Sequence, residues 1–387
     1  MNFLFLSPNF PTMYYRFGAA LKSLGGNVLG VGDEYYDNLT EAQKGALTEY
    51  YRVDSLGNYE QVLKALGYFT NRYGKLDKID SFNEYWLEEE AALRTDFNID
   101  GLKLAEMKQL QQKSYMKKIY QKAGIKAPEG ILYEKQSGPI REFSERVGFP
   151  LIAKPDKGVG AQKTFKINDP AELDDFILNY PDQGYFLECF VKGQLESFDG
   201  MTDQEGKVVF YTSHVFSQGI METVNKNLDL MYYSRRDIPQ DLVDAGLRLH
   251  KILKLQTRFF HFEFFRTNDN DLIALEMNLR PPGGLTVDMF NFANDFDLYY
   301  QWANVALFNR FSAATNRPYH TCFAGRKNQN HYSLSHQEIL SVMGSQLVHH
   351  EPITPVFRNA IGDYGYILRD TDLGKVTHLA NLILQKV

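Results

Sequence analysis

Residues 259–280, FFHFEFFRTNDNDLIALEMNLR, constrain the fold more than any other stretch, because polar side chains recur at fixed positions within apolar runs. Hydrophobicity alternates with a period of two on both sides of an Asn/Asp-rich break, which predicts a β-hairpin. Glu263, Glu276 and Asn278 then fall on one face of the hairpin, and phenylalanines line the other. The hairpin therefore presents two carboxylates and an amide together.

The position of the turn fixes which residues oppose each other. If the turn is centred between Asp269 and Asn270, Glu263 lies opposite Glu276, with Cβ atoms about 5 Å apart. The alternation divides the second strand into two faces, one with Ile273, Leu275, Met277 and Leu279, the other with Ala274, Glu276, Asn278 and Arg280.

Two carboxylates this close repel each other unless something offsets their charge. A shared proton would do so, and so would a hard cation. Two carboxylates and an amide oxygen, completed by phosphate oxygens and water, are a usual environment of Mg²⁺ beside a nucleotide. The alternative is a solvated hairpin face with ordinary surface glutamates, and the hairpin alone does not decide between the two.

The composition is that of an ordinary globular protein. The 387 residues are 44% hydrophobic and 23% charged, and a chain of this length is expected to divide into about two to four subdomains. The net charge of −6 argues against a nucleic-acid partner, because nucleic-acid binding needs a basic surface. No apolar run reaches the ~20 residues that a membrane span needs.

The cysteines and the N-terminus suggest the compartment. Cys189 and Cys322 are too few for a disulfide framework and lack the spacing of a metal site. The N-terminal sequence MNFLFLSPNF has no basic segment and only a short apolar run, unlike a signal peptide. We therefore expect a cytoplasmic protein without a membrane partner.

The start of the chain indicates an α/β unit. Residues 3–7 and 27–32 are short apolar runs, and a helical segment at 14–24 separates them. This order is typical of a doubly wound fold. The segment 7–16 follows the first strand, where such a fold places a ligand loop. It lacks the G-x-G-x-x-G fingerprint, which disfavours a dinucleotide-dependent oxidoreductase.

Further elements follow along the chain. Residues 103–124 are predicted to form one long helical stretch rich in lysine and glutamine, and 290–311 another helix. Residues 148–167 indicate a strand, a glycine loop and a second strand. A helix is predicted to begin after Asp169, and 208–216 alternate as a strand does.

Two connections have features of a nucleotide site. In KPDKGVGA at 154–161, Gly158 and Gly160 let backbone N–H groups converge on an anion, and Lys154 adds a positive charge. A flexible hairpin turn is the alternative. LECFVKG at 187–193 lies between two predicted strands, where a backbone N–H and C=O could pair with an adenine edge. A plain connection is the alternative there.

In this order the segments resemble the ATP-grasp family, specifically the carboxylate–amine or carboxylate–thiol ligases related to the carbamoyl-phosphate synthase large chain and the L-amino-acid ligases. The resemblance rests on Lys113 before GIKAP, then AKPDKGVGA, LECFVKG with SFD, and HFEFF with ALEMNLRPPGG. Each motif is short, and the order and spacing carry the specificity. The resemblance covers most of the chain. It implies an α/β and α+β multidomain fold, a Rossmann-like pre-ATP-grasp domain followed by a two-lobed ATP-grasp fold.

The resemblance also implies four segments. Residues 1–110 would be the pre-ATP-grasp α/β domain, and 111–192 the small lobe with a lid loop. Residues 193–317 would be the large lobe with the metal-binding hairpin, and 318–387 a C-terminal αβ appendage.

The resemblance assigns roles to the matching positions. Mg²⁺, or Mn²⁺, would be bound by Glu263, Glu276 and Asn278. ATP would be contacted by Lys113, Lys154, Gly158, Gly160, the hinge residues Glu188, Cys189, Phe190 and Val191, and Glu196. Arg280 and Lys154 would act in catalysis, with the planar guanidinium of Arg280 holding a carboxylate or an acyl phosphate.

One position departs from the family pattern. Relatives often place a ribose-binding glutamate two residues after the hinge glycine, where this chain has Leu195, with Glu196 next to it. A slip of one residue along a strand turns a side chain to the other face, and a bulge would restore it.

Other residues are weaker candidates. Asp288 is expected either to orient an amine substrate or to be an acid at a helix N-terminus. Glu222 and Lys226 are candidate substrate contacts in a predicted loop facing the site. His261 would lie near the metal, although a packed strand histidine is equally consistent, and we expect His214 to be structural.

The implied reaction has two steps. A carboxylate attacks the γ-phosphorus of ATP to give ADP and an acyl phosphate, and an amine or thiol then displaces phosphate. The partners would be small-molecule carboxylates and amines, and a homodimer is the commonest assembly for a protein of this kind. The alternatives are a kinase of the same fold that phosphorylates a small molecule, and a non-catalytic ATP-binding module. A requirement for an amine would separate the ligase from the kinase.

Overall fold

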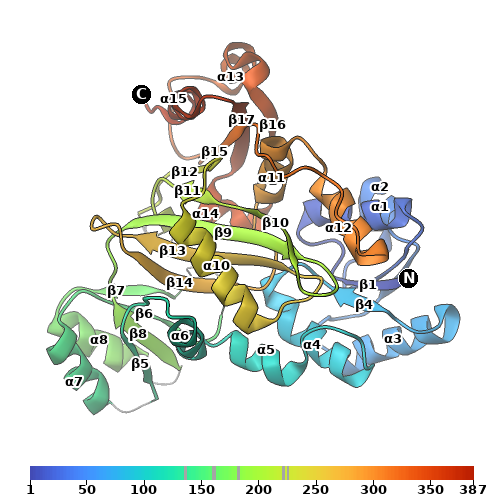
Figure 1. The fold of residues 1–387 in the computed structure, drawn as a ribbon, viewed down its shortest axis with the longest axis horizontal. Coiled ribbons are helices and arrows are strands. Elements are labelled where there is room, and N and C mark those ends of the chain that lie inside the picture. Colours follow the sequence, from blue (N-terminus) through green and yellow to red (C-terminus); the bar gives the residue numbers. More distant parts are fainter. Residues whose placement is uncertain (135–136, 159–162, 181–183, 220–222, 225) are drawn as a thin grey trace.

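Three β-sheets organise the part of the chain that the computed structural model describes, which is residues 1–387 without 135–136, 159–162, 181–183, 220–222 and 225 (Figure 1). Helices pack on each of the sheets. Within the described residues, no helix combines the length and the apolar character that crossing a membrane requires.

The N-terminal sheet is parallel, with the strand order β3-β2-β1-β4. Its strands are β1 (Asn2–Leu6), β2 (Asn27–Gly32), β3 (Glu49–Arg52) and β4 (Lys78–Asp80). Its helices are α1 (Tyr15–Ser23), α2 (Glu41–Ala46), α3 (Tyr59–Tyr73) and α4 (Leu87–Asp96). This is the α/β unit that the alternation of apolar runs and helical segments predicts.

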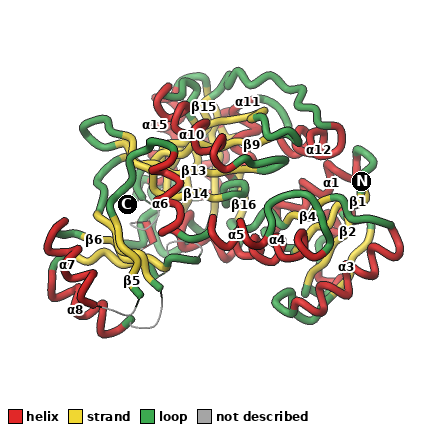
Figure 2. Tube along the Cα trace, turned by 60° about the horizontal axis from the view of Figure 1, so that its bottom comes forward, coloured by secondary structure: helices red, strands yellow, loops and turns green. Residues whose placement is uncertain are grey.

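A small antiparallel sheet has the order β5-β8-β6-β7 and lies at one end of the molecule (Figures 1 and 2). Its strands are β5 (Gly130–Tyr133), β6 (Leu151–Pro155), β7 (Phe165–Ile167) and β8 (Tyr185–Cys189). The helices α7 (Ser137–Val147) and α8 (Pro170–Asn179) cover it with one apolar cluster. Asp169 caps α8, as predicted, because its side chain accepts a hydrogen bond from the backbone of Glu172.

The central sheet has nine strands in the order β14-β13-β9-β11-β12-β15-β17-β16, with β10 paired to β9. They are β9 (Gln194–Thr202), β10 (Val208–Thr212), β11 (His214–Phe216), β12 (Leu230–Ser234), β13 (Phe259–Arg266), β14 (Leu272–Asn278), β15 (His320–Arg326), β16 (Leu347–Pro352) and β17 (Tyr364–Asp370). The alternating segment 208–216 therefore forms two strands. Because β15 pairs with β12, the C-terminal strands extend the central sheet.

The two faces of the central sheet pack against different partners. The front face, defined by Leu195, Phe259, Tyr232 and Phe323, packs against the N-terminal sheet and its helices and against α11 (Thr286–Asn294) and α12 (Leu298–Phe308). The back face, defined by Phe198, Phe260, Cys322 and Ala324, packs against four helices. These are α6 (Lys113–Lys122), α10 (Gln240–Leu253), α13 (His336–Val342) and α15 (Leu373–Leu384).

The prediction of one long helix at 103–124 is wrong. The chain forms α5 (Leu104–Leu110) and α6 (Lys113–Lys122) instead. The backbone N–H of Lys113 donates to the carbonyl of Asp156 at 2.9 Å, so the start of α6 is held by the end of β6. A tertiary contact therefore interrupts a sequence of high helix propensity.

The prediction of one helix at 290–311 is also wrong. The segment contributes to α11 (Thr286–Asn294) and α12 (Leu298–Phe308). Asp295 ends α11 in the left-handed conformation, with φ of 59°, and the side chain of Asp297 caps α12. The remaining short elements are α14 (Arg358–Ile361) and 3₁₀ turns at Thr12–Tyr14, Tyr36–Asn38, Glu84–Trp86, Gly344–Gln346 and Pro355–Phe357.

Candidate functional site

The hairpin of β13 and β14 places its polar side chains as the sequence predicts. Glu263 pairs with Glu276, and His261 pairs with Asn278, in an antiparallel register. Glu263 has the same parity along β13 as Phe259, so these side chains lie on the front face. The predicted register and the predicted carboxylate pair are confirmed.

The rest of the hairpin differs from the prediction. Beyond Glu263 the register shifts, because Phe264 pairs with Ala274 and Leu275 is the extra residue of a β-bulge. Ala274 therefore packs on the back face in one cluster with Phe264, and the prediction that it shares a face with Glu276 is wrong. With the bulge, the turn is centred on Asp269 and not between Asp269 and Asn270. The carboxylate pair is unaffected because it lies on the far side of the bulge from the turn.

Helix α6 brings a buried lysine to the hairpin. Lys113 Nζ lies 3.5 Å from Glu276 Oε1 and 3.5 Å from the carbonyl oxygen of Gly158, in the glycine loop. Burial would raise the pKa of Glu276, but attraction to Lys113, Lys154 and Arg280 lowers it. The carboxylate of Glu276 is therefore held in its charged form.

A second carboxylate lies between Lys117 of α6 and Lys154 of β6. Glu188 is 2% exposed, and its oxygens lie 2.6 Å from Lys154 Nζ and 2.5 Å from Lys117 Nζ. Burial opposes the charge on Lys154, but Glu188 and Glu276 attract it and raise its pKa. Sequence reasoning missed Lys117. Its position one helical turn after Lys113, on the same side of α6, was the available signal.

The predicted adenine hinge joins β8 to β9. The N–H of Cys189 donates to the carbonyl of Glu129 at 2.9 Å, and the N–H of Phe190 to that of Pro150 at 3.1 Å. The N–H of Val191 has no backbone partner among the described residues. Of the hinge N–H groups named from sequence, that of Val191 is therefore the candidate donor to a base.

Arg280 follows the hairpin and contacts the N-terminal domain. Its Nε donates to Glu84 Oε2 at 3.0 Å, and its Nη1 donates to the carbonyl of Pro281 at 2.8 Å. Burial raises the pKa of Glu84, against the opposing attraction of Arg280. Sequence reasoning missed Glu84. It follows the carboxyl end of β4, the edge where parallel sheets bind ligands, and this was the available signal.

A buried network links Glu263 to the middle of the sheet. His261 Nε2 lies 2.9 Å from Glu263 Oε1, and its Nδ1 lies 2.5 Å from Asp199 Oδ1. The other oxygen of Asp199 accepts from Ser197 Oγ at 2.7 Å and lies 3.0 Å from His214 Nδ1. Burial would lower the pKa of His261, but Asp199 and Glu263 raise it to about 9. His261 is thus a buried histidine of β13 and also contacts a candidate metal ligand, so both expectations for it are consistent with the structure.

Asp288 lies on α11 and pairs with the N-terminal domain. Its Oδ1 lies 2.5 Å from Arg16 Nη1 and 3.4 Å from the hydroxyl of Tyr299. Its Oδ2 is buried and has no hydrogen-bond partner among the described residues. Burial raises the pKa of Asp288, and attraction to Arg16 opposes the shift.

Glu196 does not join the other candidates. It is fully buried on the back face, where its oxygens lie 2.8 Å from Arg266 Nε and 2.7 Å from Arg235 Nη2. Strand β9 pairs with β13 without a register shift from Gln194 to Met201, so no bulge turns Glu196 to the front. Glu196 therefore lies on the opposite face of the sheet from Glu263 and Glu276, because neighbouring residues of a strand point to opposite faces.

Some candidates lie at or beyond the limits of what the structure describes. Gly160 and Glu222 lie outside the described residues. Gly158 has a φ of +144°, a conformation that favours glycine, and Lys226 lies exposed in a turn. Among the described residues, no group of three His, Cys, Asp or Glu side chains is arranged to hold a metal ion. A metal at the hairpin would therefore need the amide of Asn278 beside the two carboxylates.

Comparison with known proteins gives one distant relative by sequence. The L-arginine-specific L-amino acid ligase of Bacillus subtilis is 22% identical over 258 residues. The match spans 64% of this chain and 62% of that protein, which is less than two thirds of its length. No family model matches the chain.

Solved structures match over nearly the whole chain. N5-carboxyaminoimidazole synthetase from Staphylococcus aureus has a TM-score of 0.74 and 14% identity, covering 99% of this chain and 97% of that chain. L-amino acid ligase from Bacillus licheniformis has a TM-score of 0.72 and 14% identity, covering 100% and 98%. The biotin carboxylase domain of Hydrogenobacter thermophilus 2-oxoglutarate carboxylase, solved with MgADP, has a TM-score of 0.72 and 15% identity, covering 97% and 88%. At these identities the likeness establishes the fold, and the predicted fold class is confirmed.

Proposed function

We propose that this protein, a chain with the ATP-grasp fold, is an ADP-forming ligase that joins a small-molecule carboxylate to an amine. The observation that carries the proposal is the meeting of the hairpin with the small lobe. There Glu276 lies 3.5 Å from Lys113, and Lys154 is electrostatically coupled to both Glu276 and Glu263. Acidic metal ligands facing buried lysines are the arrangement that holds a nucleotide triphosphate and its metal.

The donors on the hairpin fit Mg²⁺ or Mn²⁺. Glu263 and Glu276 supply two carboxylates, and Asn278 supplies an amide oxygen, all from adjacent positions of paired strands. These are hard oxygen ligands, and their small number suits an ion that keeps phosphate oxygens and water as its other ligands. When bound, the metal would neutralise charge on the phosphates.

The lysines act on the nucleotide under this proposal. Lys113 and Lys154 are each 7% exposed and are charge-paired with Glu276 and Glu188. The phosphates of ATP would take over part of these pairings, so the lysines would bind and orient the γ-phosphate. Glu188, which also pairs with Lys117, keeps Lys154 in position, and the backbone of Val191 would meet the adenine.

Arg280 would hold the carboxylate substrate and then the acyl phosphate. The carboxylate oxygen attacks the γ-phosphorus, ADP leaves, and an amine attacks the carbonyl carbon of the acyl phosphate to form an amide and release phosphate. Glu84 orients the guanidinium of Arg280 through the 3.0 Å hydrogen bond. Asp288, whose Oδ2 has no partner among the described residues, would receive the ammonium or amine of a substrate.

The comparisons support this proposal without supplying the substrates. Two of the matched proteins are amino acid ligases by name, and a third is a carboxyaminoimidazole synthetase. By name these ligases act on amino acids, which carry both a carboxylate and an amine. We therefore propose that small carboxylates, amino acids among them, accept the phosphoryl group, and that small amines are the nucleophiles of the second step.

The test is release of ADP and phosphate from Mg-ATP. The protein is incubated with pooled carboxylates, amino acids included, with and without pooled amines, and Glu276→Ala serves as the blank. The proposal expects release that requires both pools and is absent in the variant. Release of ADP without phosphate, in the presence of a hydroxyl compound and no amine, would overturn the ligase in favour of a kinase.

A further inference from the structure

Two rows of polar side chains cross the front face of the central sheet, from the hairpin to the strand beside it. Each row consists of paired positions on β14, β13 and β9. The first row is Asn278, His261 and Asp199, and the second is Glu276, Glu263 and Ser197. The hairpin members include the candidate metal ligands, and the two members on β9 are fully buried. The polar side chains of β9 therefore lie next to the proposed metal site.

His261 connects the two rows. Its side chain is buried, its Nε2 lies 2.9 Å from Glu263 Oε1, and its Nδ1 lies 2.5 Å from Asp199 Oδ1. Each ring nitrogen faces a carboxylate oxygen, so each is placed to donate an N–H. The imidazole thus joins a candidate metal ligand to a buried carboxylate.

Asp199 is held from its other side. Its Oδ2 accepts from Ser197 Oγ at 2.7 Å and lies 3.0 Å from His214 Nδ1. The backbone N–H of His214 donates to Ser197 Oγ at 3.2 Å, and the rings of His214 and Phe290 pack with their centroids 5.3 Å apart. A carboxylate that is fixed at both oxygens keeps the ring of His261 in one orientation.

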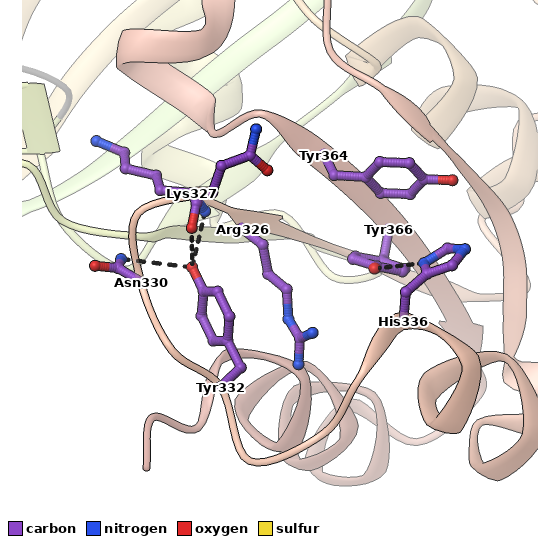
Figure 3. Close-up of a pocket in the computed structure, with 8 residues that line it drawn as sticks. Arg326, Lys327, Asn330, Tyr332, His336, Tyr364 and Tyr366 are labelled. Atoms are coloured by element: carbon purple, nitrogen blue, oxygen red, sulfur yellow. Dashed lines mark hydrogen bonds between the residues drawn. The ribbon is translucent and has the colours of Figure 1, made fainter.

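Other histidines of the chain show what a packed histidine does. His336 lines a pocket in the C-terminal part of the chain, where its Nδ1 lies 2.9 Å from the hydroxyl of Tyr366 (Figure 3). His250 Nε2 donates to the carbonyl of Gly206 at 2.7 Å. Each of these rings uses one nitrogen, on an uncharged partner. A ring that served only to satisfy Asp199 would likewise need one nitrogen, and His261 uses both.

The contact with His261 leaves Glu263 one carboxylate oxygen for a metal. Oε1 faces the ring, so Oε2 is the oxygen that would meet the ion. Mg²⁺ takes six ligands at about 2.0–2.1 Å in an octahedron, whereas Ca²⁺ takes about six to eight at 2.3–2.6 Å and accepts both oxygens of a carboxylate. A glutamate with one oxygen already engaged therefore suits Mg²⁺ or Mn²⁺ better than Ca²⁺.

We propose that His261, oriented by Asp199, is a positioning residue that engages one oxygen of Glu263 and so makes the hairpin select Mg²⁺ or Mn²⁺ over Ca²⁺. The inference rests on the metal site of the proposed function and adds the basis on which that site distinguishes between ions. Selection of this kind follows from denying the wrong ion a ligand that it needs.

Displacement of bound Mn²⁺ tests the proposal by binding, without turnover. Mn²⁺ held by the protein together with a non-hydrolysable ATP analogue is followed through the relaxation rate of water protons, and Mg²⁺ or Ca²⁺ is titrated in. The Ca²⁺ concentration at half displacement, divided by that of Mg²⁺, measures the selection. The affinity of the analogue itself for each ion is the same in every variant and cancels from the comparison.

Two substitutions of His261 separate its two contacts. The amide of His261→Asn takes the place of Nδ1, so this variant keeps a donor for Asp199 and loses the one for Glu263. The amide of His261→Gln takes the place of Nε2 and keeps the donor for Glu263. Both variants lose the ring and any charge on it. We expect His261→Asn to lower the ratio about tenfold and His261→Gln to change it by less than about threefold.

The outcomes separate this inference from the proposed function. An unchanged ratio in His261→Asn, or the same loss in both variants, would overturn the inference and leave the metal site standing. Absence of bound Mn²⁺ in the unaltered chain would overturn the inference together with the metal site of the proposed function.

A measurement on the unaltered chain decides the question if the variants fail to fold. Ring N–H protons bonded to carboxylates give separate signals in NMR spectra of protein with isotope-labelled histidine. Glu263→Gln, a change at a partly exposed side chain, identifies the signal of His261 Nε2. We expect this signal to persist when Mg²⁺ or Ca²⁺ is added with the ATP analogue. Its loss with either ion would show that the ion takes both oxygens of Glu263, which would overturn the inference.

Discussion

Glu276 on the front face of the central sheet and Glu196 on the back face are both enclosed by cations, but the enclosures differ. Glu196 is fully buried, and two arginines contact its two oxygens at 2.7 and 2.8 Å. Glu276 has a side chain that is 28% exposed, and its ion-pair partner is Lys113 at 3.5 Å. The carboxylate on the back is saturated by its partners, and the one on the front has room for another ligand.

The contrast shows that burial and charge pairing do not by themselves mark a functional carboxylate. Glu196 is the more buried of the two and the more tightly paired. What distinguishes Glu276 is a second carboxylate, Glu263, directly opposite it. Two like charges at this distance are unfavourable without a cation between them, and so they indicate a ligand.

The largest expected effect compares the two faces by activity. Under the proposed function, Glu276→Gln should lower kcat/KM for ATP turnover at least about a hundredfold, because it would remove a metal ligand that acts where charge develops. Glu196→Gln, the matched change on the back face, should lower it no more than a few-fold. Steady-state kinetics at saturating Mg²⁺ measures both. Equal losses in the two variants would remove the functional difference between the faces.

The next effect compares the two lysines that hold Glu188. Lys154→Met should reduce turnover more than Lys117→Met, because Lys154 is also attracted by Glu276 and Glu263, whereas Lys117 lies against the rings of Tyr120 and Phe186. We expect a loss of about tenfold to a hundredfold for Lys154→Met and a smaller one for Lys117→Met. Kinetics with varied ATP gives kcat and KM separately. If Lys117→Met reduced turnover more than Lys154→Met, Lys117 would be the phosphate ligand.

How far the sequence predicts this site depends on how far apart in the sequence the interacting residues lie. The carboxylate pair was predictable because period-two alternation and a polar turn are local, and they set which side chains of a hairpin face each other. The bulge at Leu275 was not predictable, because it goes with the packing of Ala274 and Phe264 in one cluster of the folded chain. The break before α6 was not predictable either, since it depends on a contact with β6.

Contacts between residues that are distant in sequence could not be predicted either. The hydrogen bond of Arg280 with Glu84 joins positions 196 residues apart. The face of Glu196 was left open by the sequence, because either a bulge or regular pairing of β9 was consistent with its pattern. Regular pairing with β13 settles it. Residue types and spacing thus indicate the chemistry of the site, and tertiary register decides which candidates take part.

The third prediction compares the two glutamates by stability. Glu196→Gln should lower the free energy of unfolding by about 2–4 kcal/mol, because Arg235 and Arg266 lose a buried counter-charge. Glu276→Gln should lower it by less than this, because the side chain of Glu276 is 28% exposed and its ion pair with Lys113 is longer, at 3.5 Å. Urea unfolding monitored by circular dichroism measures both. A larger loss for Glu276→Gln would mean that the hairpin charges serve the fold.

The smallest expected effect is in the pH dependence of stability, and it involves a histidine on the back face. Burial lowers the pKa of His250, whose Nε2 donates to the carbonyl of Gly206 at 2.7 Å and whose Nδ1 is buried without a partner among the described residues. The unfolded chain binds this proton near pH 6.5 and the folded chain only at lower pH, so protonation favours unfolding as the pH falls below about 6.5. His250→Gln keeps a donor for Gly206 and lacks the titration. As the pH is lowered from about 7 to about 5, the unaltered chain should therefore lose free energy of unfolding relative to this variant. A difference that stays constant over this range would show that His250 titrates alike in the folded and unfolded chain.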